Sequence, residues 1–191
     1  MTLQYTNRRG QIYHLYQGIT KNNKPKYFFS TKNDGNGVET IPDGFEIYEN
    51  PNAQVFLRKI ETPLITELEK QIVVAEIKKN QSVQHFIVEV KKDYITLYTA
   101  QSNPVFEQDS WRAQLRQLRN LQPSLIGLNY SAQMRFQLVH AENRDFMAER
   151  FCYRGSVDDW ITISDPECLS NLAKQFVPHL GKDSFYELYP V

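Results

Sequence analysis

The chain has 191 residues with 22 basic and 22 acidic side chains, so its formal charge at pH 7 is zero. Its hydrophobic and charged fractions, 41% and 23%, lie near globular averages, which excludes a wholly disordered chain. No apolar run is long enough to span a bilayer, and the first ten residues lack the apolar segment of a signal peptide, so we expect a cytoplasmic protein with no membrane partner.

Charge is segregated along the chain although the total is neutral. Residues 1–33 contain six basic side chains and no acidic one, and residues 110–141 contain four arginines and no acidic one. Residues 34–61 and 155–191 each hold six acidic and two basic side chains, a net charge of −4. If these blocks fold against one another they neutralise, whereas if like blocks share a face the protein has a basic side.

The first 60 residues have the pattern of two β-hairpins. Aromatic-rich runs at 11–18 and 25–31 are separated by a polar turn at 20–24. A second pair of runs, 44–48 and 54–58, flanks Asn50-Pro51-Asn52, where proline and asparagine favour a turn. We expect a small antiparallel sheet with one face in water.

The next segment predicts a helix followed by a third hairpin. Thr62 and Pro63 suit the start of a helix over 62–79, and its apolar stripe consists of Ile65, Leu68, Ile72 and Ala75. Residues 81–100 then alternate between apolar and polar side chains around a tight turn at 92–93, which indicates two antiparallel strands.

The remainder of the chain predicts two more helices around three strands. Residues 106–121 have helical spacing, and the strands are expected at 134–138, 146–153 and 160–163. A last helix over 165–180 is expected to be capped by Ser164 or Asp165 and to end at Gly181. Its apolar stripe consists of Leu169, Leu172, Ala173, Phe176 and Leu180.

These elements predict an α+β protein in which an antiparallel sheet built from hairpins packs against about three amphipathic helices. We find no repeat of fixed period. The weakest join is the short polar stretch near residue 80, so the chain divides into 1–80 and 81–191 or forms one continuous domain.

Signals for catalysis are weak. Glu89 and Lys91 have the E-x-K spacing of some metal-dependent nucleases, but strand alternation places them on a solvent face. His140 and Cys152 fall on neighbouring predicted strands and could form a nucleophile and base, although a buried thiol beside a histidine is the more ordinary outcome. Cys152 and Cys168 lack metal-ligand spacing, so we expect reduced, buried thiols and no metal. We also expect no catalytic residue and no cofactor.

Binding signals are better. Aromatic rings at Tyr13, Tyr16, Tyr27 and Phe29 could stack on a ligand, and basic side chains at Arg8, Arg9, Arg112, Arg116 and Arg119 could contact phosphates or a partner. The neutral isoelectric point argues against a nucleic-acid protein. The sequence therefore favours a non-enzymatic binding module with a protein partner. A nucleic-acid-associated protein is the alternative, and a metal-dependent hydrolase or nuclease comes third.

Overall fold

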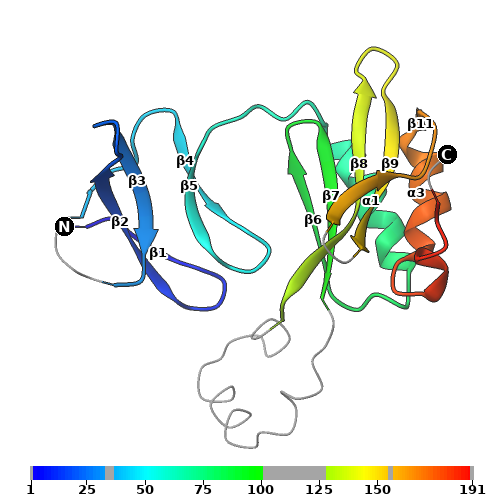
Figure 1. Ribbon diagram of the computed structural model, residues 1–191, viewed down its shortest axis with the longest axis horizontal. Coiled ribbons are helices and arrows are strands. Elements are labelled where there is room, and N and C mark those ends of the chain that lie inside the picture. The colour runs from blue at the N-terminus through cyan, green and yellow to red at the C-terminus, as the bar shows by residue number, and fades with distance from the viewer. Residues whose placement is uncertain (1, 33–36, 101–127, 155–156, 190–191) are drawn as a thin grey trace, which may run out of the picture. The chain divides into compact units, whose positions relative to one another are not determined.

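The computed structural model describes residues 2–32, 37–100, 128–154 and 157–189. The described residues form two compact units (Figure 1). The first contains residues 2–60 with Leu128 and Asn129, and the second contains residues 61–100 and 130–189.

The first unit is built from antiparallel strands. Strands β1 (Gln4–Thr6), β2 (Ile12–Ile19) and β3 (Pro25–Ser30) form one sheet in the order β1-β2-β3. Strands β4 (Phe45–Glu49) and β5 (Val55–Lys59) form a two-stranded sheet. Both hairpins predicted from the sequence are confirmed, with the turns between β2 and β3 and between β4 and β5.

Two hairpin turns of this unit share one sequence motif and one turn geometry, which were not predicted from the sequence. The sequences Tyr5-Thr6-Asn7-Arg8-Arg9-Gly10-Gln11 and Tyr48-Glu49-Asn50-Pro51-Asn52-Ala53-Gln54 follow the pattern Tyr-x-Asn-x-x-(Gly/Ala)-Gln. In each turn the asparagine Oδ1 accepts hydrogen bonds from the backbone N–H groups two and four residues later. The fourth turn residue, Gly10 or Ala53, has a positive φ of 76° or 64°. Asparagine at the first position favours this geometry because its side chain mimics a backbone acceptor.

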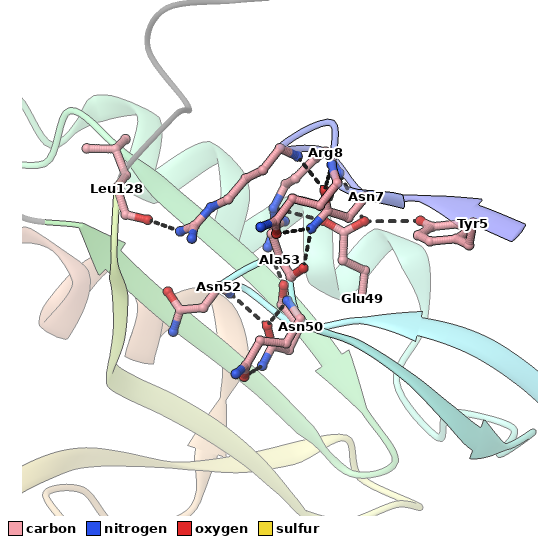
Figure 2. A network of polar contacts seen from close by, with 11 residues as sticks. Tyr5, Asn7, Arg8, Glu49, Asn50, Asn52, Ala53 and Leu128 are labelled. Carbon is pink, nitrogen blue, oxygen red and sulfur yellow. Dashed lines mark hydrogen bonds and ion pairs between the residues drawn. The ribbon is translucent and has the colours of Figure 1, made fainter. Parts of the chain in front are cut away.

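Asn7 also joins the two hairpins. Its Nδ2 donates to the backbone carbonyl of Ala53 at 2.7 Å, and both residues are buried, at 3% and 1% exposed (Figure 2). Among the described residues, Asn50, the equivalent residue of the second turn, makes side-chain hydrogen bonds only within its own turn. The first unit is thus held at this end by a buried polar contact as well as by its apolar core.

The second unit contains a larger antiparallel sheet. Its strands are β6 (Phe86–Lys91), β7 (Tyr94–Ala100), β8 (Tyr130–His140), β9 (Asp145–Arg154) and β10 (Val157–Thr162), in the order β10-β9-β8-β7-β6. A two-residue strand, β11 (Glu167–Cys168), also pairs with β9. The predicted hairpin around residues 92–93 and the three predicted later strands are confirmed.

Two α-helices pack on one side of this sheet (Figure 1). They are α1 (Glu67–Lys79) and α3 (Leu169–Phe176), and short 3₁₀ turns follow at Val177–His179 and Asp183–Phe185. Ile95, Met134, Phe136 and Phe146 are fully buried beneath the helices and form the centre of the core. The α+β class with antiparallel sheets is confirmed, whereas the predicted third helix at 106–121 lies outside the described residues.

The prediction for α1 was wrong in its start and half right in its buried face, since Ile65 and Ile72 of the predicted stripe contact the core. The helix begins after Thr66, whose side chain accepts from the Glu69 backbone N–H while the Glu69 carboxylate accepts from the Thr66 backbone. In this capping box, Thr66 and Glu69 supply side-chain acceptors to two backbone N–H groups at the start of the helix, and Thr62 followed by Pro63 forms no such pair. Leu68 is 79% exposed and Ala75 is also exposed, whereas the fully buried residues of the helix are Val73 and Ile77.

The prediction for α3 was right in its buried face. All five residues of the predicted stripe are buried, and Gly181 follows with a φ of 78°. The predicted cap was wrong, because Cys168 occupies the N-cap position and residues 167–168 pair with β9 as β11.

Helix α1 belongs to the second unit, where it packs against α3 and β6. The two units therefore divide at residue 60, and the polar stretch near residue 80, proposed from the sequence as a boundary, lies inside the second unit. Within it, the buried Asn80 donates to the backbone carbonyls of Val177 and Leu180, both at 2.9 Å. No helix in the described ranges is long and apolar enough to cross a membrane.

Candidate binding faces

The aromatic residues predicted to form one stacking surface lie on opposite faces of the β1-β2-β3 sheet. The pairing of β2 with β3 places Tyr13, Tyr27 and Phe29 on one face. Tyr16 lies on the other face, where it is 7% exposed and its hydroxyl donates to the backbone carbonyl of Lys32 at 2.9 Å. The predicted four-ring surface is therefore not formed, because successive side chains of a strand point to opposite faces.

The face with Tyr27 is an interior face of the first unit. The Tyr27 ring packs against Phe45 of β4, with centroids 6.4 Å apart, and Leu15 on the same face is fully buried. The Tyr5 hydroxyl donates to Glu49 Oε2 at 3.1 Å, and burial and this carboxylate raise the pKa of Tyr5. These rings pack between the two sheets of the unit.

The basic side chains predicted to bind phosphate near the amino terminus already have acceptors (Figure 2). Arg8 Nε lies 3.2 Å from Glu49 Oε1, and its guanidinium also donates to the backbone carbonyl of Asn50. The Arg9 guanidinium donates to the backbone carbonyl of Leu128 at 2.5 Å. The other three predicted residues, Arg112, Arg116 and Arg119, lie outside the described residues.

The histidine and thiol considered as a catalytic pair are far apart. His140 ends β8, where its Nδ1 lies 3.3 Å from Asp145 Oδ2 at the start of β9. Cys152 lies seven residues further along β9 and pairs with Asp159 of β10. At about 3.3 Å per residue the two groups are about 20 Å apart, too far for proton transfer.

The E-x-K motif does not form a metal site. Glu89 accepts a hydrogen bond from the Tyr98 hydroxyl at 3.0 Å, while Phe86, Val88 and Val90 alternate with it and pack against the core. Within the described residues, no group of three or more His, Cys, Asp or Glu side chains could hold a metal ion.

The two thiols differ in exposure. Both cysteines are free, and Cys152 is buried as predicted, at 8% exposed. Cys168 is exposed, contrary to the prediction. Its position before α3, at the N-cap, places it outside the apolar stripe that the helix buries.

The second unit presents a sheet face opposite its two helices, which we call the outer face. Along β9, Phe146 and Ala148 are fully buried on the helix side, whereas Glu149, Phe151 and Tyr153 alternate with them on the outer side. The register extends this face over all five long strands. Its aromatic and charged residues are Glu89, Lys91, Tyr94, Tyr98, Arg135, Glu149, Phe151, Tyr153, Asp158 and Trp160.

Arg135 occupies the centre of the outer face. Its guanidinium carbon lies 4.3 Å from the ring centroid of Tyr94 and 4.3 Å from that of Trp160. Its Nε donates to Glu149 Oε2 at 2.5 Å across the β8–β9 pair. The guanidinium thus contacts two aromatic rings and a carboxylate from three different strands.

An aromatic cluster continues from Arg135 toward β10. The rings of Phe151 and Trp160 meet edge to face with centroids 5.2 Å apart, and those of Phe151 and Tyr153 are 4.8 Å apart. Tyr153 is 58% exposed. Exposed rings supported by other rings supply rigid apolar contact area to a partner.

The other end of the outer face holds phenols with raised pKa values. Burial, the nearby charge of Glu89 and the hydrogen bond to it raise the pKa of Tyr98 far above its usual range. Burial also raises the pKa of Tyr94, although Arg135 opposes the shift. Both hydroxyls therefore stay protonated at physiological pH and act as neutral hydrogen-bonding groups.

Sequence reasoning identified the strands of this face but not the face itself. The signal present was the placement of Phe151 and Tyr153 in β9 and of Trp160 in β10 at positions that alternate with the core. Which rings meet depends on the strand order and register, which local patterns do not specify. No family model, curated protein or solved structure matches the chain.

Proposed function

We propose that this chain is a non-enzymatic binding protein that recognises a protein partner on the outer face of its second unit. The observation that carries the proposal is Arg135 held between Tyr94 and Trp160 beside an aromatic cluster, on the sheet side opposite α1 and α3. Trp, Tyr and Arg are the residues that contribute most to binding energy at protein interfaces, and apolar rings around a charged centre are typical of such sites.

The charges of the outer face favour a protein partner over a nucleic acid. Lys91 and Arg135 are accompanied by Glu89, Glu149 and Asp158, so the face is not basic. A surface that binds a phosphate backbone instead needs several uncompensated cations. A nucleic-acid-associated protein is the second proposal, because exposed rings can also stack on bases. A cytoplasmic location is part of the same proposal.

A peptide selection tests the proposal. Peptides displayed on phage are selected against the full chain, and the tightest are titrated into ¹⁵N-labelled protein while backbone amide resonances are followed. We expect shifts on β7 to β10, and a loss of affinity of about tenfold or more in Trp160→Ala and in Tyr153→Ala. Tyr153→Ala is the gentler variant because this side chain is 58% exposed.

Phe56→Ala provides the matched control, because Phe56 is an exposed aromatic residue of the first unit, at 46% exposed. It should leave peptide affinity unchanged. Shifts confined to the first unit, or peptides that bind both outer-face variants as well as the wild type, would contradict the proposal. Micromolar, salt-sensitive binding of a single-stranded oligonucleotide would favour the second proposal instead.

A further inference from the structure

Arg135 has hydrogen-bond donors that the described residues do not use. A guanidinium has five N–H groups, one on Nε and four on Nη1 and Nη2. The Nε donates to Glu149, whereas neither Nη1 nor Nη2 forms a hydrogen bond within the described part of the chain. The side chain is 22% exposed, so these donors remain accessible to a binding partner.

The edge of this guanidinium that carries Nη1 and Nη2 has no acceptor among the described residues. The guanidinium carbon lies over the rings of Tyr94 and Trp160, 4.3 Å from each centroid, and Glu149 accepts from Nε. The two terminal nitrogens of the planar group lie side by side. Two parallel N–H donors on such an edge match two acceptor oxygens bonded to one atom.

We propose that the protein partner places a carboxylate, from an aspartate, a glutamate or a chain end, against the Nη1–Nη2 edge of Arg135. This inference rests on the proposed function, since it names the chemical group that the outer face recognises. The neighbouring rings of Phe151 and Tyr153 then contact apolar atoms of the same peptide segment.

The surroundings favour a carboxylate over a phosphate. Glu149 already balances the charge of Arg135, and Glu89 and Asp158 lie on the same face. A phosphate group carries up to two negative charges and is repelled by these carboxylates about twice as strongly as a carboxylate ion. A carboxylate and a phosphate can both accept two parallel hydrogen bonds from this edge, so the difference in charge decides the preference.

The first unit offers a matched control residue. Arg58 Nε donates to Glu46 Oε1 at 2.8 Å, and its guanidinium carbon lies 4.3 Å from the ring centroid of Tyr48. Arg58 therefore has the same chemistry on a β-hairpin, while its side chain is more exposed, at 37%. Arg58→Lys controls for the loss of a stacked arginine elsewhere in the protein.

Small anions test the site without a known partner. Sodium acetate and inorganic phosphate are titrated separately into the ¹⁵N-labelled full chain, and the Nε–H resonances of Arg135 and Arg58 are followed. We expect acetate to shift the Arg135 resonance with saturation and at concentrations that leave Arg58 unchanged. A stronger response to phosphate would overturn the choice of carboxylate, and no response of Arg135 to either ion would overturn the inference.

The selected peptides provide a double-mutant test. Each Asp or Glu of a peptide is replaced by Asn or Gln, and each variant is titrated with wild type, Arg135→Lys and Arg58→Lys. We expect one replacement to weaken binding to the wild type and to Arg58→Lys by about 10- to 100-fold, the value of a charge-assisted hydrogen bond. Binding to Arg135→Lys should fall less than threefold on the same replacement, because lysine cannot donate two parallel hydrogen bonds.

The two proposals fail in different ways. Peptides that shift the outer face but show no dependence on an acidic residue would overturn the carboxylate and leave the binding function standing. Peptides that bind elsewhere, or no selected peptides at all, would overturn the binding function together with the carboxylate.

Discussion

Asn7 and Asn50 occupy the same position of the same turn, so comparing their removal isolates the contact between the two hairpins. Each side chain makes three equivalent hydrogen bonds within its own turn. Asn7 makes one more, to the carbonyl of Ala53 at 2.7 Å. The two alanine variants therefore differ in the loss of one buried hydrogen bond, which joins residues 46 positions apart in the sequence.

The magnitudes follow from the burial of the two sites. In Asn50→Ala the freed backbone groups lie near solvent, so water replaces part of the loss and we expect a cost of about 1 kcal/mol. Asn7→Ala has the same local cost and also leaves the buried carbonyl of Ala53 without a donor, which adds about 1 to 3 kcal/mol. We therefore expect a total of about 2 to 4 kcal/mol for Asn7→Ala.

Aspartate substitutions sharpen the comparison. Asp retains the Oδ1 acceptor that closes the turn but lacks the Nδ2 donor. Asn50→Asp should therefore cost less than about 0.5 kcal/mol. Asn7→Asp should cost at least as much as Asn7→Ala, because a carboxylate would then face the Ala53 carbonyl with no proton between them.

Urea unfolding of the full chain, followed by amide resonances, measures each unit separately. With a slope of about 1 kcal/mol per molar, the midpoint of first-unit resonances should fall by about 1 M in Asn50→Ala and by about 2 to 4 M in Asn7→Ala. Resonances of the second unit serve as the internal control and should keep their midpoint. Equal costs for Asn7→Ala and Asn50→Ala would refute the reasoning, and so would an Asn7→Asp variant as stable as wild type.

Four further outcomes are expected. Phe176→Ala should cost the second unit about 3 to 5 kcal/mol in urea unfolding, because this ring is 4% exposed in the core, and a cost below about 1 kcal/mol would contradict its placement. Gly181→Ala should destabilise its unit more than Gly44→Ala destabilises the first unit, as measured on the amide resonances of each. Both glycines have a φ of 78°, which costs an alanine about 1 kcal/mol, but only at Gly181 would the added Cβ also lie 2.9 Å from a backbone oxygen. Burial acts to raise the pKa of Glu69, but hydrogen bonds from Arg144 and Thr66 lower it below its usual value. The stabilisation by this carboxylate is therefore present above about pH 4.3 and is lost as pH falls through its lowered pKa. Stability measured from pH 6 to pH 2 should therefore fall less in Glu69→Gln than in wild type. The exposed Cys168 should react rapidly with a thiol reagent in the native protein, and the buried Cys152 should react only after unfolding. Rapid reaction of both thiols, or of neither, would contradict the structure.

The sequence by itself determined the elements whose signals are local. The hairpins β2–β3, β4–β5 and β6–β7 were predicted because the turn residues and the alternation of each lie in one short stretch of sequence, whereas the β1–β2 hairpin was not predicted. The buried stripe of α3 was predicted because the helix is apolar on one side only. In the segment of α1 the predicted stripe of Ile65, Leu68, Ile72 and Ala75 was only half right, because Ile65 and Ile72 contact the core whereas the fully buried residues of the helix are Val73 and Ile77. Apolar residues occur around most of this helix, so its neighbours, not its own pattern, select the buried side.

Only the tertiary structure decided which residues meet. The four aromatic residues predicted as one surface were separated by strand parity, since a single-residue difference in position moves a side chain to the opposite face. The helix that follows residue 60 was assigned to the second unit by its packing on α3, whose residues lie about 100 positions later. Arg135, Tyr94 and Trp160 come from three strands spread over more than 60 residues, and their contact depends on strand order and register. Such contacts depend on the whole sheet, because burial of one face against the helices is what sets the register that brings them together.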